Sequence, residues 1–290
     1  MTSQADATRE MPEMHGIRGT RAVPEIGGST RLYAVLGYPV AQVKAPGLLN
    51  PVFAELGLDA VLVPVLAEPR HLAEVVRGLQ RIGNLDGLLV TIPHKIDVCR
   101  YADRVSHAVT LAGSANALRR EPDGSWFAEN FDGAGLVRGL ESAGFKPAGR
   151  RVALVGAGGA GGAVAAAPLG ADIAHLAVCD PDEDRLDTLV SRLEQHYPGR
   201  ISGSTAPRVR DVDLAVNATP LGLRPDDALP FEVEQLAPGT VVADIIMQPK
   251  DTALLQAAAA LGHRVHHGSH MLTHQIDLYR EFFGLDRVTG

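Results

Sequence analysis

A glycine-rich run near the middle of the chain has the residue types and spacing of a dinucleotide-binding turn. The segment 151–155 is mostly apolar, as in a buried strand, and Gly156, Gly158 and Gly161 follow it. Glycines at this spacing let backbone N–H groups approach a pyrophosphate at the amino end of the next helix. A purely structural strand–turn–helix is the alternative. We expect Pro168 to kink or end that helix near Ala167.

An acidic residue, Asp180, directly follows the next apolar run, 173–179. A carboxylate at this place typically holds a ribose 2′-hydroxyl. The 2′-phosphate of NADP carries about two negative charges and would face this carboxylate, with Asp182 adding another. The sequence therefore predicts NAD as the cofactor, preferred over NADP. Arg185 lies a turn into the following helix, where it could pair with Asp180 or assist a phosphate.

Lysine is scarce in this chain, because only Lys44, Lys95, Lys146 and Lys250 occur among its 27 lysine and arginine residues. Arginine fills the generic surface charge. A retained lysine is therefore a candidate for a role that needs an ammonium group able to exchange a proton. Taken alone, Lys95 would be interpreted as a solvated loop lysine.

Histidines cluster near the carboxyl end, and His267, His270 and His274 have helix-like spacing. No acidic residue or cysteine lies among them, so we expect structural or surface histidines and no metal site. The two cysteines, Cys99 and Cys179, lie far apart. They exclude a Cys-rich metal site and make a disulfide framework unexpected.

Strands alternate with helices on both sides of the glycine run, which predicts an α/β fold with parallel sheets. The expected strands before it are 31–36, 60–66 and 86–92, the helices are 46–56, 72–82 and 133–142, and a hairpin pairs 116–119 with 125–129. After it we expect strands 213–218 and 241–246 and helices 183–196, 252–261 and 271–283.

Length, charge and apolar content limit the classes of function that the protein can have. A length of 290 residues suggests about two domains, and the net charge of −7 argues against a nucleic-acid partner. No run approaches the roughly 18 apolar residues needed to span a bilayer. The polar segment 1–29, interrupted by Gly and Pro, predicts a flexible N-terminal arm without a signal peptide, and hence a cytoplasmic protein.

Six short motifs, taken in order, resemble those of the shikimate/quinate dehydrogenase family. They are Thr91-Ile-Pro-His-Lys95, Leu111-Ala-Gly-Ser-Ala-Asn116-Ala-Leu118, Asn130-Phe-Asp132-Gly133, Gly156-Ala-Gly-Gly-Ala160, Asn217-Ala-Thr219 and Met271-Leu-Thr-His-Gln275. The resemblance covers about Tyr33 to Phe283. It implies an NAD(P)-dependent oxidoreductase that interconverts a ring secondary alcohol and a ketone.

The resemblance also implies two α/β domains with the site in a cleft between them. We expect a substrate-binding domain with a parallel-rich sheet, made of residues 30–131 and 266–290. A Rossmann-type NAD-binding domain would comprise residues 132–265. The expected partner is a small cyclic alcohol or ketone, and we expect the chain to act as a monomer or homodimer.

By resemblance, Lys95 matches the family's catalytic lysine and Asp132 its partner aspartate. When hydride leaves a carbon, the hydroxyl proton must leave too, and an amine can accept it. The carboxylate would orient the amine and bond the adjacent hydroxyl. Thr91, Asn116 and Gln275 are implied to bind ring hydroxyls. The implied cofactor contacts are Gly156, Ala157, Gly158, Gly159, Ala160, Gly161, Asp180, Asn217, Ala218 and Thr219.

The chain departs from the family where the substrate carboxylate is held. Val43 and Ala45 stand in place of two serines. Leu89 replaces an asparagine, Phe131 a threonine and Met247 a tyrosine. A buried carboxylate without hydrogen-bond donors is strongly disfavoured. We therefore expect the alcohol chemistry to be kept, on a substrate with a neutral or hydrophobic substituent in place of the carboxylate.

Several alternatives stay open. Asp132 could cap the helix that starts near Gly133, and Asn116 could be an ordinary hairpin residue. Replacement donors for a carboxylate could come from Gln42, His94 or Tyr38. The chain could be a dinucleotide-binding regulatory protein without turnover, or another enzyme on the same two-domain plan, such as a methylene-tetrahydrofolate dehydrogenase. The 130–133 motif speaks against the last.

Overall fold

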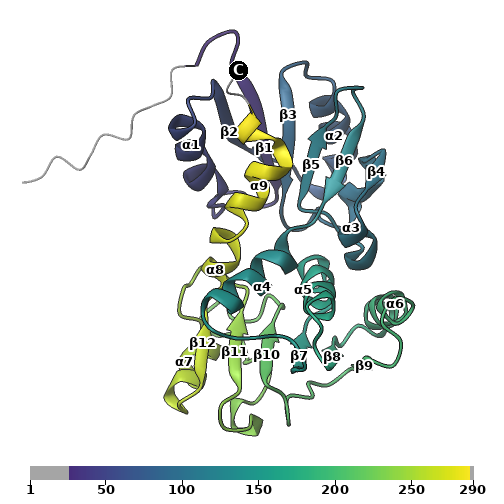
Figure 1. Ribbon diagram of the computed structural model, residues 1–290, viewed down its shortest axis with the longest axis vertical. Helices are drawn as coiled ribbons and strands as arrows, with labels where there is room; N and C mark the ends of the chain where they lie inside the picture. Colours follow the sequence, from purple (N-terminus) through teal and green to yellow (C-terminus); the bar gives the residue numbers. More distant parts are fainter. Residues whose placement is uncertain (1–25, 288–290) are drawn as a thin grey trace, which may run out of the picture.

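The computed structural model describes residues 26–287, and these build two sheets that lie one above the other along the long axis (Figure 1). The mixed α/β fold with two parallel-rich sheets confirms the predicted class. The predicted arm, residues 1–29, lies almost entirely outside the described residues. The domain boundaries placed after residues 131 and 265 stay a prediction.

The first sheet contains three parallel strands and an antiparallel hairpin. Its strands are β1 (Arg31–Gly37), β2 (Ala60–Leu66), β3 (Leu85–Val90), β4 (Arg104–Val105), β5 (Ala117–Arg120) and β6 (Trp126–Glu129). They lie in the order β2-β1-β3-β5-β6-β4. The predicted hairpin is confirmed, since β5 pairs antiparallel with β6 and Arg120 lies opposite Trp126.

The second sheet is parallel throughout. Its strands are β7 (Arg151–Val155), β8 (His175–Cys179), β9 (Ile201–Ser204), β10 (Leu214–Asn217), β11 (Val241–Asp244) and β12 (Arg264–His266). The order β12-β11-β10-β7-β8-β9 is that of dinucleotide-binding folds. The strand order reverses between β7 and β10. Ligands of such sheets bind beyond the carboxyl ends of the strands at that point.

Helices cover both sheets and join them. They are α1 (Ala45–Glu55), α2 (Leu72–Gln80), α3 (His107–Ala112), α4 (Asp132–Ser142), α5 (Gly159–Gly170), α6 (Glu183–Glu194), α7 (Ala253–Ala260), α8 (Gly268–Thr273) and α9 (Ile276–Phe283). The last helix, α9, returns to the first sheet (Figure 1), where Tyr279 and Phe282 join the apolar cluster of Tyr33 and Phe53. No helix within residues 26–287 is long and apolar enough to cross a bilayer.

Two helix predictions need correction. The single helix expected over 271–283 is two helices, α8 and α9, with His274 and Gln275 at the break. The helix after the glycine run does not end near Ala167 but continues to Gly170. A proline removes one main-chain donor. Pro168 lies in the last turn, and Ala171 N still donates to Ala167 O at 3.0 Å, so the helix loses little.

Glycines set the close approach of helix α5 to its neighbours in both halves of the molecule. A Cβ on Gly133 of α4 would lie 2.1 Å from Ala163 O of α5, and one on Gly162 of α5 would lie 2.2 Å from Ala112 O of α3. Both obstacles are backbone atoms, which cannot move aside alone. Glycine is therefore required where α5 passes between α3 and α4, and this packing fixes the two sheets relative to each other.

Candidate active site

Lys95 is held in a short turn that follows β3. The buried His94 ring lies with Nε2 2.8 Å from Ala67 O. The Lys95 carbonyl accepts the Ala115 N–H at 2.8 Å. These contacts fix the backbone on both sides of the lysine. Ordering the long lysine side chain still costs up to about 2 kcal/mol of rotamer entropy, which its contacts inside the protein must offset.

Asp132 is the first residue of α4. Its N–H donates to Asn130 Oδ1 at 3.0 Å, and Asn130 Nδ2 in turn donates to Ser114 O at 2.9 Å. The amino end of α4 has no side-chain cap, so the capping role considered for Asp132 is wrong. The carboxylate is free for contacts outside its own helix.

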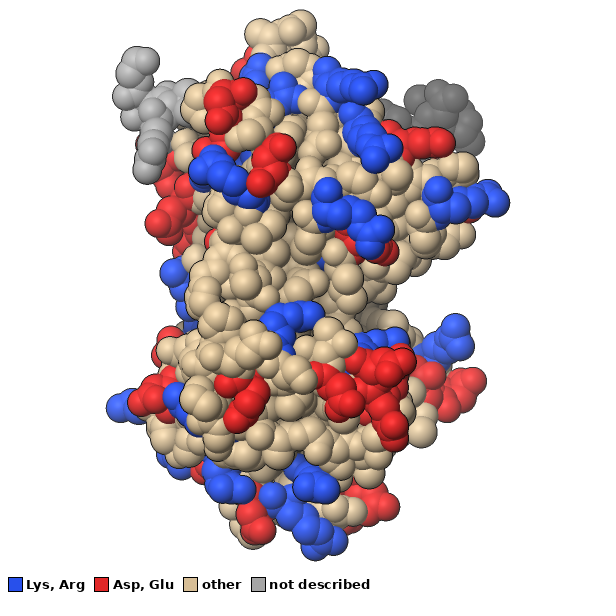
Figure 2. All heavy atoms as spheres, turned by 90° about the vertical axis from the view of Figure 1, so that its right-hand side faces the viewer, with Lys and Arg blue, Asp and Glu red and all other residues tan. Residues whose placement is uncertain are grey.

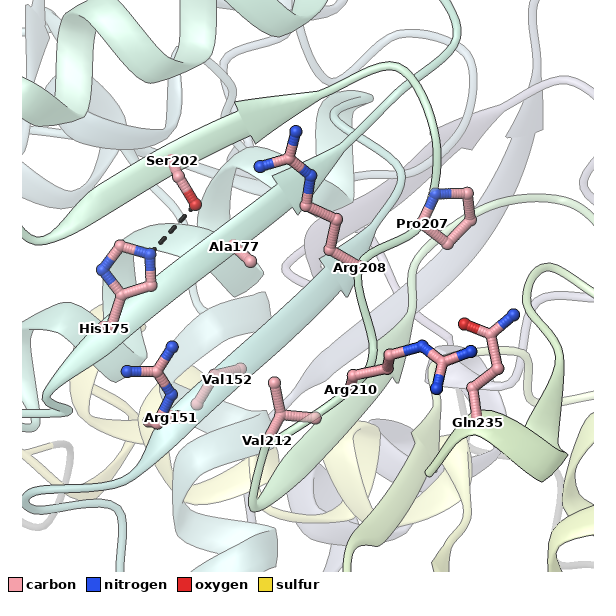
Figure 3. Close-up of a pocket in the computed structure, with 10 residues that line it drawn as sticks. All are labelled: Arg151, Val152, His175, Ala177, Ser202, Pro207, Arg208, Arg210, Val212 and Gln235. Atoms are coloured by element: carbon pink, nitrogen blue, oxygen red, sulfur yellow. Dashed lines mark hydrogen bonds between the residues drawn. The ribbon is translucent and has the colours of Figure 1, made fainter. Parts of the chain in front are cut away.

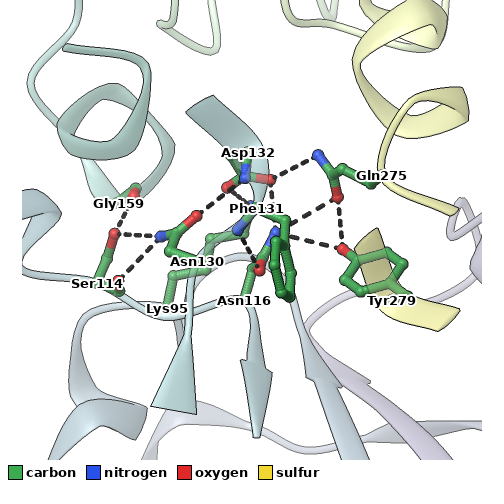
Figure 4. A network of polar contacts seen from close by, with 9 residues as sticks. All are labelled: Lys95, Ser114, Asn116, Asn130, Phe131, Asp132, Gly159, Gln275 and Tyr279. Atoms are coloured by element: carbon green, nitrogen blue, oxygen red, sulfur yellow. Dashed lines mark hydrogen bonds and ion pairs between the residues drawn. The ribbon is translucent and has the colours of Figure 1, made fainter. Parts of the chain in front are cut away.

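The two side chains form a buried ion pair. Lys95 Nζ lies 2.5 Å from Asp132 Oδ2, and the side chains are only 11% and 4% exposed. The other carboxylate oxygen, Oδ1, accepts from Asn116 Nδ2 at 2.9 Å and from Gln275 Nε2 at 3.3 Å (Figure 4). A buried charge is tolerated when it is paired and hydrogen-bonded, and this carboxylate is both.

Asn116 does more than a hairpin residue would. It lies just before β5 and is 2% exposed, and its Oδ1 accepts the Phe131 N–H at 2.9 Å. Its amide therefore joins the strand end to the Asp132 turn. Gln275, at the break between α8 and α9, reaches the same carboxylate from the carboxyl end of the chain.

Tyr279 is a member of this network that the sequence analysis missed. Its hydroxyl donates to Gln275 Oε1 at 2.5 Å and lies 3.3 Å from Asn116 Nδ2 (Figure 4). Burial, and then the charge of Asp132, raise the pKa of the Tyr279 hydroxyl well above its usual range, so the group stays protonated. The sequence did contain a signal for this contact: Tyr279 follows Gln275 by four residues, and residues at that spacing lie on the same face of a helix.

The glycine run lies beside the ion pair. A Cβ on Gly159 would lie 3.2 Å from Lys95 Cβ, and Ser114 Oγ donates to Gly159 O at 2.5 Å. Helix α5 begins here with no side-chain cap, and the place of a Gly158 Cβ is open space. The first N–H groups of a helix have no intrahelical partner and favour anions. This cradle fits the pyrophosphate of a dinucleotide.

The turn after β10 packs against the glycine turn. Gly156 has φ +109°, and a Cβ on it would lie 2.8 Å from the carbonyl carbon of Ala218. Asn217 Oδ1 accepts from the Thr219 N–H at 3.0 Å, and this bond shapes its own loop. The structure thus brings the predicted cofactor residues together at the point where the strand order reverses.

The Asp180 side chain binds the main chain of the glycine turn. It is 4% exposed, and its two oxygens accept the Ala157 N–H at 2.7 Å and the Asp182 N–H at 3.0 Å. Arg185 Nη1 lies 3.6 Å from Oδ1. Sequence reasoning assigned this carboxylate to a ribose, whereas the structure shows it holding main-chain donors beside a guanidinium.

A hollow of about 380 Å³ opens between the two halves, next to the glycine turn. Ala157 and Gly158 line one side, the end of α3 at Gly113 lines another, and Arg185 and Arg192 of α6 line the third. Figure 2 shows this side of the molecule, where the waist between the halves is hollowed and charged side chains of both signs lie along its lower edge. Asp182 and Asp184 line the hollow as well, so it carries two guanidiniums and two carboxylates.

The five apolar replacements gather in one place. Ala45 and Leu89 are buried members of the apolar cluster beneath α9, and Val43, Phe131 and Met247 pack against it. Tyr279 belongs to the same cluster and joins it to the polar network. An apolar wall therefore adjoins the Asp132 carboxylate. This adjacency could not be derived from residues so far apart in the sequence.

Thr91 lies at the carboxyl end of β3, half-buried, with its side chain against the backbone of Gly37. Within residues 26–287 its hydroxyl makes no hydrogen bond to the network. Tyr38 follows β1 at the same edge, and its N–H donates to Ile92 O at 2.9 Å. Thr91 therefore borders the site without joining the hydrogen-bonded group.

Two of the clustered histidines bond to side chains of neighbouring elements. His267 Nε2 lies 2.9 Å from Asp251 Oδ1, and His274 Nε2 lies 3.0 Å from Ser142 Oγ. His266 is buried and stacks on His270, and burial lowers the pKa of His266 to about 4. Over the described part of the chain, no three His, Cys, Asp or Glu side chains are arranged to hold a metal ion.

A second hollow, of about 400 Å³, lies away from this site (Figure 3). It is lined by Arg151 and His175, which begin β7 and β8, and by Arg208 and Arg210. The glycine turn follows the opposite, carboxyl end of β7. Since ligands of such sheets bind at the carboxyl ends, this hollow is separate from the dinucleotide cradle.

Comparisons with known proteins agree with this architecture. Residues 35–118 match the shikimate dehydrogenase substrate binding domain. A shikimate dehydrogenase (NADP(+)) of Rubrobacter xylanophilus is 38% identical over 275 residues, covering 93% of this chain and 96% of the relative.

Two solved structures resemble the whole fold. The shikimate dehydrogenase of Aquifex aeolicus is 26% identical with a TM-score of 0.80, over 90% of this chain and 95% of its own. The 5-ketofructose reductase of a Gluconobacter strain is 28% identical with a TM-score of 0.78, over 89% and 94%.

The expected preference for NAD over NADP is contradicted by these relatives. The Rubrobacter protein and four further curated relatives all bear the name shikimate dehydrogenase (NADP(+)). The physical reason for the error is the buried state of Asp180, whose oxygens are occupied by main-chain N–H groups.

A relative that is 38% identical and spans nearly all of both chains places the sequence in a family. With the strand order, the cradle and the polar network described above, the protein belongs to the shikimate/quinate dehydrogenase family of oxidoreductases.

Proposed function

We propose that the protein interconverts a secondary alcohol and a ketone on a small polyhydroxylated ring, with NADP as the cofactor and Lys95 and Asp132 as the catalytic pair. The observation that carries this proposal is the buried Lys95–Asp132 ion pair, 2.5 Å across, beside Gly159 of the dinucleotide turn.

The proton steps fall to the chain's own side chains. Lys95 Nζ accepts the hydroxyl proton as the neutral amine when the alcohol is oxidised, and the resulting ammonium returns that proton when the ketone is reduced. Asp132 holds the amine in place and accepts a hydrogen bond from a neighbouring substrate hydroxyl. Asn116 and Gln275, which already donate to Asp132, supply further contacts to ring hydroxyls. The bound dinucleotide would supply the hydride acceptor or donor.

The cofactor would lie along the uncapped amino end of α5, with its pyrophosphate on the N–H groups that follow Gly158. Arg185 supports NADP, because its half-exposed guanidinium lies beside Asp180 at the rim of the hollow next to the glycine turn. A guanidinium presents several donors to a phosphate at once. Arg192 lines the same hollow and offers a second guanidinium, beside Asp182 and Asp184.

The substrate would carry a neutral group where shikimate carries its carboxylate. Val43 and Ala45 offer no donor and pack with Leu89, Phe131 and Met247 in one apolar cluster. A carboxylate against such a wall would lose its hydration without gaining hydrogen bonds. The likeness in fold to a 5-ketofructose reductase is compatible with a substrate that has no carboxylate.

The test is an initial-rate assay of reduced cofactor formed from cyclic polyols, supplied with NADP or with NAD. The wild type should form NADPH, and Lys95→Ala should lower the rate at least about 1000-fold because the proton acceptor is gone. Lys146→Ala, at an exposed site outside the network, is the matched control and should keep the wild-type rate. Equal rates in the two variants would contradict the role of Lys95, and no turnover by the wild type would favour the regulatory alternative.

A further inference from the structure

The hydroxyl of Tyr279 meets both amides that contact the Asp132 carboxylate. It donates to Gln275 Oε1 at 2.5 Å and lies 3.3 Å from Asn116 Nδ2. The residue is 3% exposed, and its ring packs edge-on against Phe131 with the centroids 5.4 Å apart. The ring is therefore held firmly, and the hydroxyl has a fixed position among the polar groups.

A carboxamide can be turned by 180° with little change of shape, so its orientation depends on its partners. The three partners of the Gln275 amide bind opposite ends of it. Asp132 Oδ1 accepts from Gln275 Nε2 at 3.3 Å, whereas Oε1 accepts from the Tyr279 hydroxyl at 2.5 Å and from Asn116 Nδ2 at the longer distance of 3.4 Å. Only one orientation satisfies all three contacts, and the short one comes from Tyr279.

We propose that Tyr279 is a positioning residue that fixes the Gln275 amide with its N–H toward Asp132. This inference rests on the proposed function, in which Asp132 and Gln275 contact the substrate. Without the hydroxyl, Oε1 keeps only the long contact with Asn116 Nδ2, and the turned amide would bring Oε1 against the carboxylate in part of the molecules. Asp132 would then lose a donor, and the substrate would meet a mixture of two orientations.

The loss has a consequence for Lys95. A carboxylate that accepts fewer amide hydrogen bonds attracts the neighbouring ammonium more strongly. The Lys95 amine should therefore react more slowly with an acylating reagent in Tyr279→Phe, which keeps the ring and removes only the oxygen. Since the chain contains only Lys44, Lys95, Lys146 and Lys250, each amine can be followed separately.

The experiment is competitive acetylation of the full chain at one fixed pH, with each lysine-containing peptide quantified by mass spectrometry. It compares the wild type, Tyr279→Phe, Gln275→Leu and the double variant. We expect Lys95 of Tyr279→Phe to be acetylated about threefold more slowly than Lys95 of the wild type, because its ammonium is held more tightly. The acetylation rates of the other three lysines should not change, and they report any general unfolding. In the Gln275→Leu background, Tyr279→Phe should slow the acetylation of Lys95 no further.

Kinetics of the same four proteins provide the second readout. Tyr279→Phe should raise KM for the preferred polyol about fivefold and change kcat less than about twofold, as expected for one lost orienting hydrogen bond. An unchanged rate of Lys95 acetylation, or an equal slowing in both backgrounds, would overturn the proposal. Slower acetylation of Lys95 in a protein without turnover would refute the proposed function alone, and turnover without the slower acetylation would refute the positioning role alone.

Discussion

A lysine and an aspartate that are both nearly fully buried must be compensated by their surroundings. Removing two charges from water is costly, and close pairing offsets that cost only when the remaining hydrogen-bonding capacity is also used. Here Asp132 Oδ2 pairs with Lys95 Nζ, and Oδ1 accepts from Asn116 and Gln275. A chain that needed only stability would more simply fill this place with apolar groups. The retained pair is therefore best explained by chemistry.

The adjoining apolar wall makes a gain of activity testable. In the double variant Val43→Ser with Ala45→Ser, two hydroxyl donors return to positions beside the cluster of Leu89 and Phe131. Each hydrogen bond to a charged group contributes about 1.5–3 kcal/mol. We expect kcat/KM for shikimate to rise at least about tenfold, measured by steady-state NADPH formation.

The control for this gain is Val43→Ala, which shortens the side chain without adding a donor. It should leave kcat/KM for shikimate within about threefold of the wild type. An equal gain in Val43→Ala would mean that space, and not hydrogen bonding, limits the reaction with a carboxylated substrate.

At the scale of elements, the site depends on how closely α5 approaches α3. The Ser114–Gly159 hydrogen bond and the contact of Lys95 with Gly159 both cross from the first half of the molecule to the amino end of α5. Gly162 lies one turn further along α5, against Ala112 O. The packing of these two helices therefore sets the distance between the Lys95 turn and the dinucleotide cradle.

Gly162→Ala should disrupt this approach. Its Cβ would lie 2.2 Å from a backbone oxygen, so the helices must separate. Overpacking of this kind typically costs about 1–3 kcal/mol of the free energy of unfolding. We expect a loss of about 2 kcal/mol in urea unfolding, together with weaker dinucleotide binding in calorimetry.

Gly78→Ala is the matched control in an exposed stretch of α2, where a Cβ would meet nothing within 4 Å. It should stabilise the protein by about 0.5–1 kcal/mol, because alanine favours helix more than glycine does. A Gly162→Ala variant as stable as this control would show that α3 moves aside freely.

The elements themselves were largely predictable from the sequence, because alternating apolar runs and glycine punctuation mark strands and helices locally. Short elements such as β4, β12 and α3 were not predicted, because a hydrophobic pattern of two to six residues is too short to show a period. The break between α8 and α9 at His274 and Gln275 was not predicted either. No glycine or proline marks it, and the contacts of Gln275 with Asp132 come from a distant part of the chain.

At the scale of the whole molecule, the candidate site draws on both sheets. Lys95 follows β3 and Asn116 precedes β5, and both strands belong to the first sheet. Asp132 is the first residue of α4, and the glycine turn belongs to the second sheet (Figure 1). The motif order identified these residues, but their distances depend on how the two halves pack. Tyr279 and the role of Asp180 in its own loop could be recognised only in three dimensions.

The most direct test of the account compares two substrates in steady-state assays of the wild-type protein with saturating NADP. One is shikimate, and the other is its neutral analogue with a hydroxymethyl group in place of the carboxylate. Because the wall of Val43 and Ala45 offers no side-chain donors to a carboxylate, we expect a kcat/KM at least about tenfold higher for the neutral analogue. A higher kcat/KM for shikimate, with a micromolar KM, would contradict it.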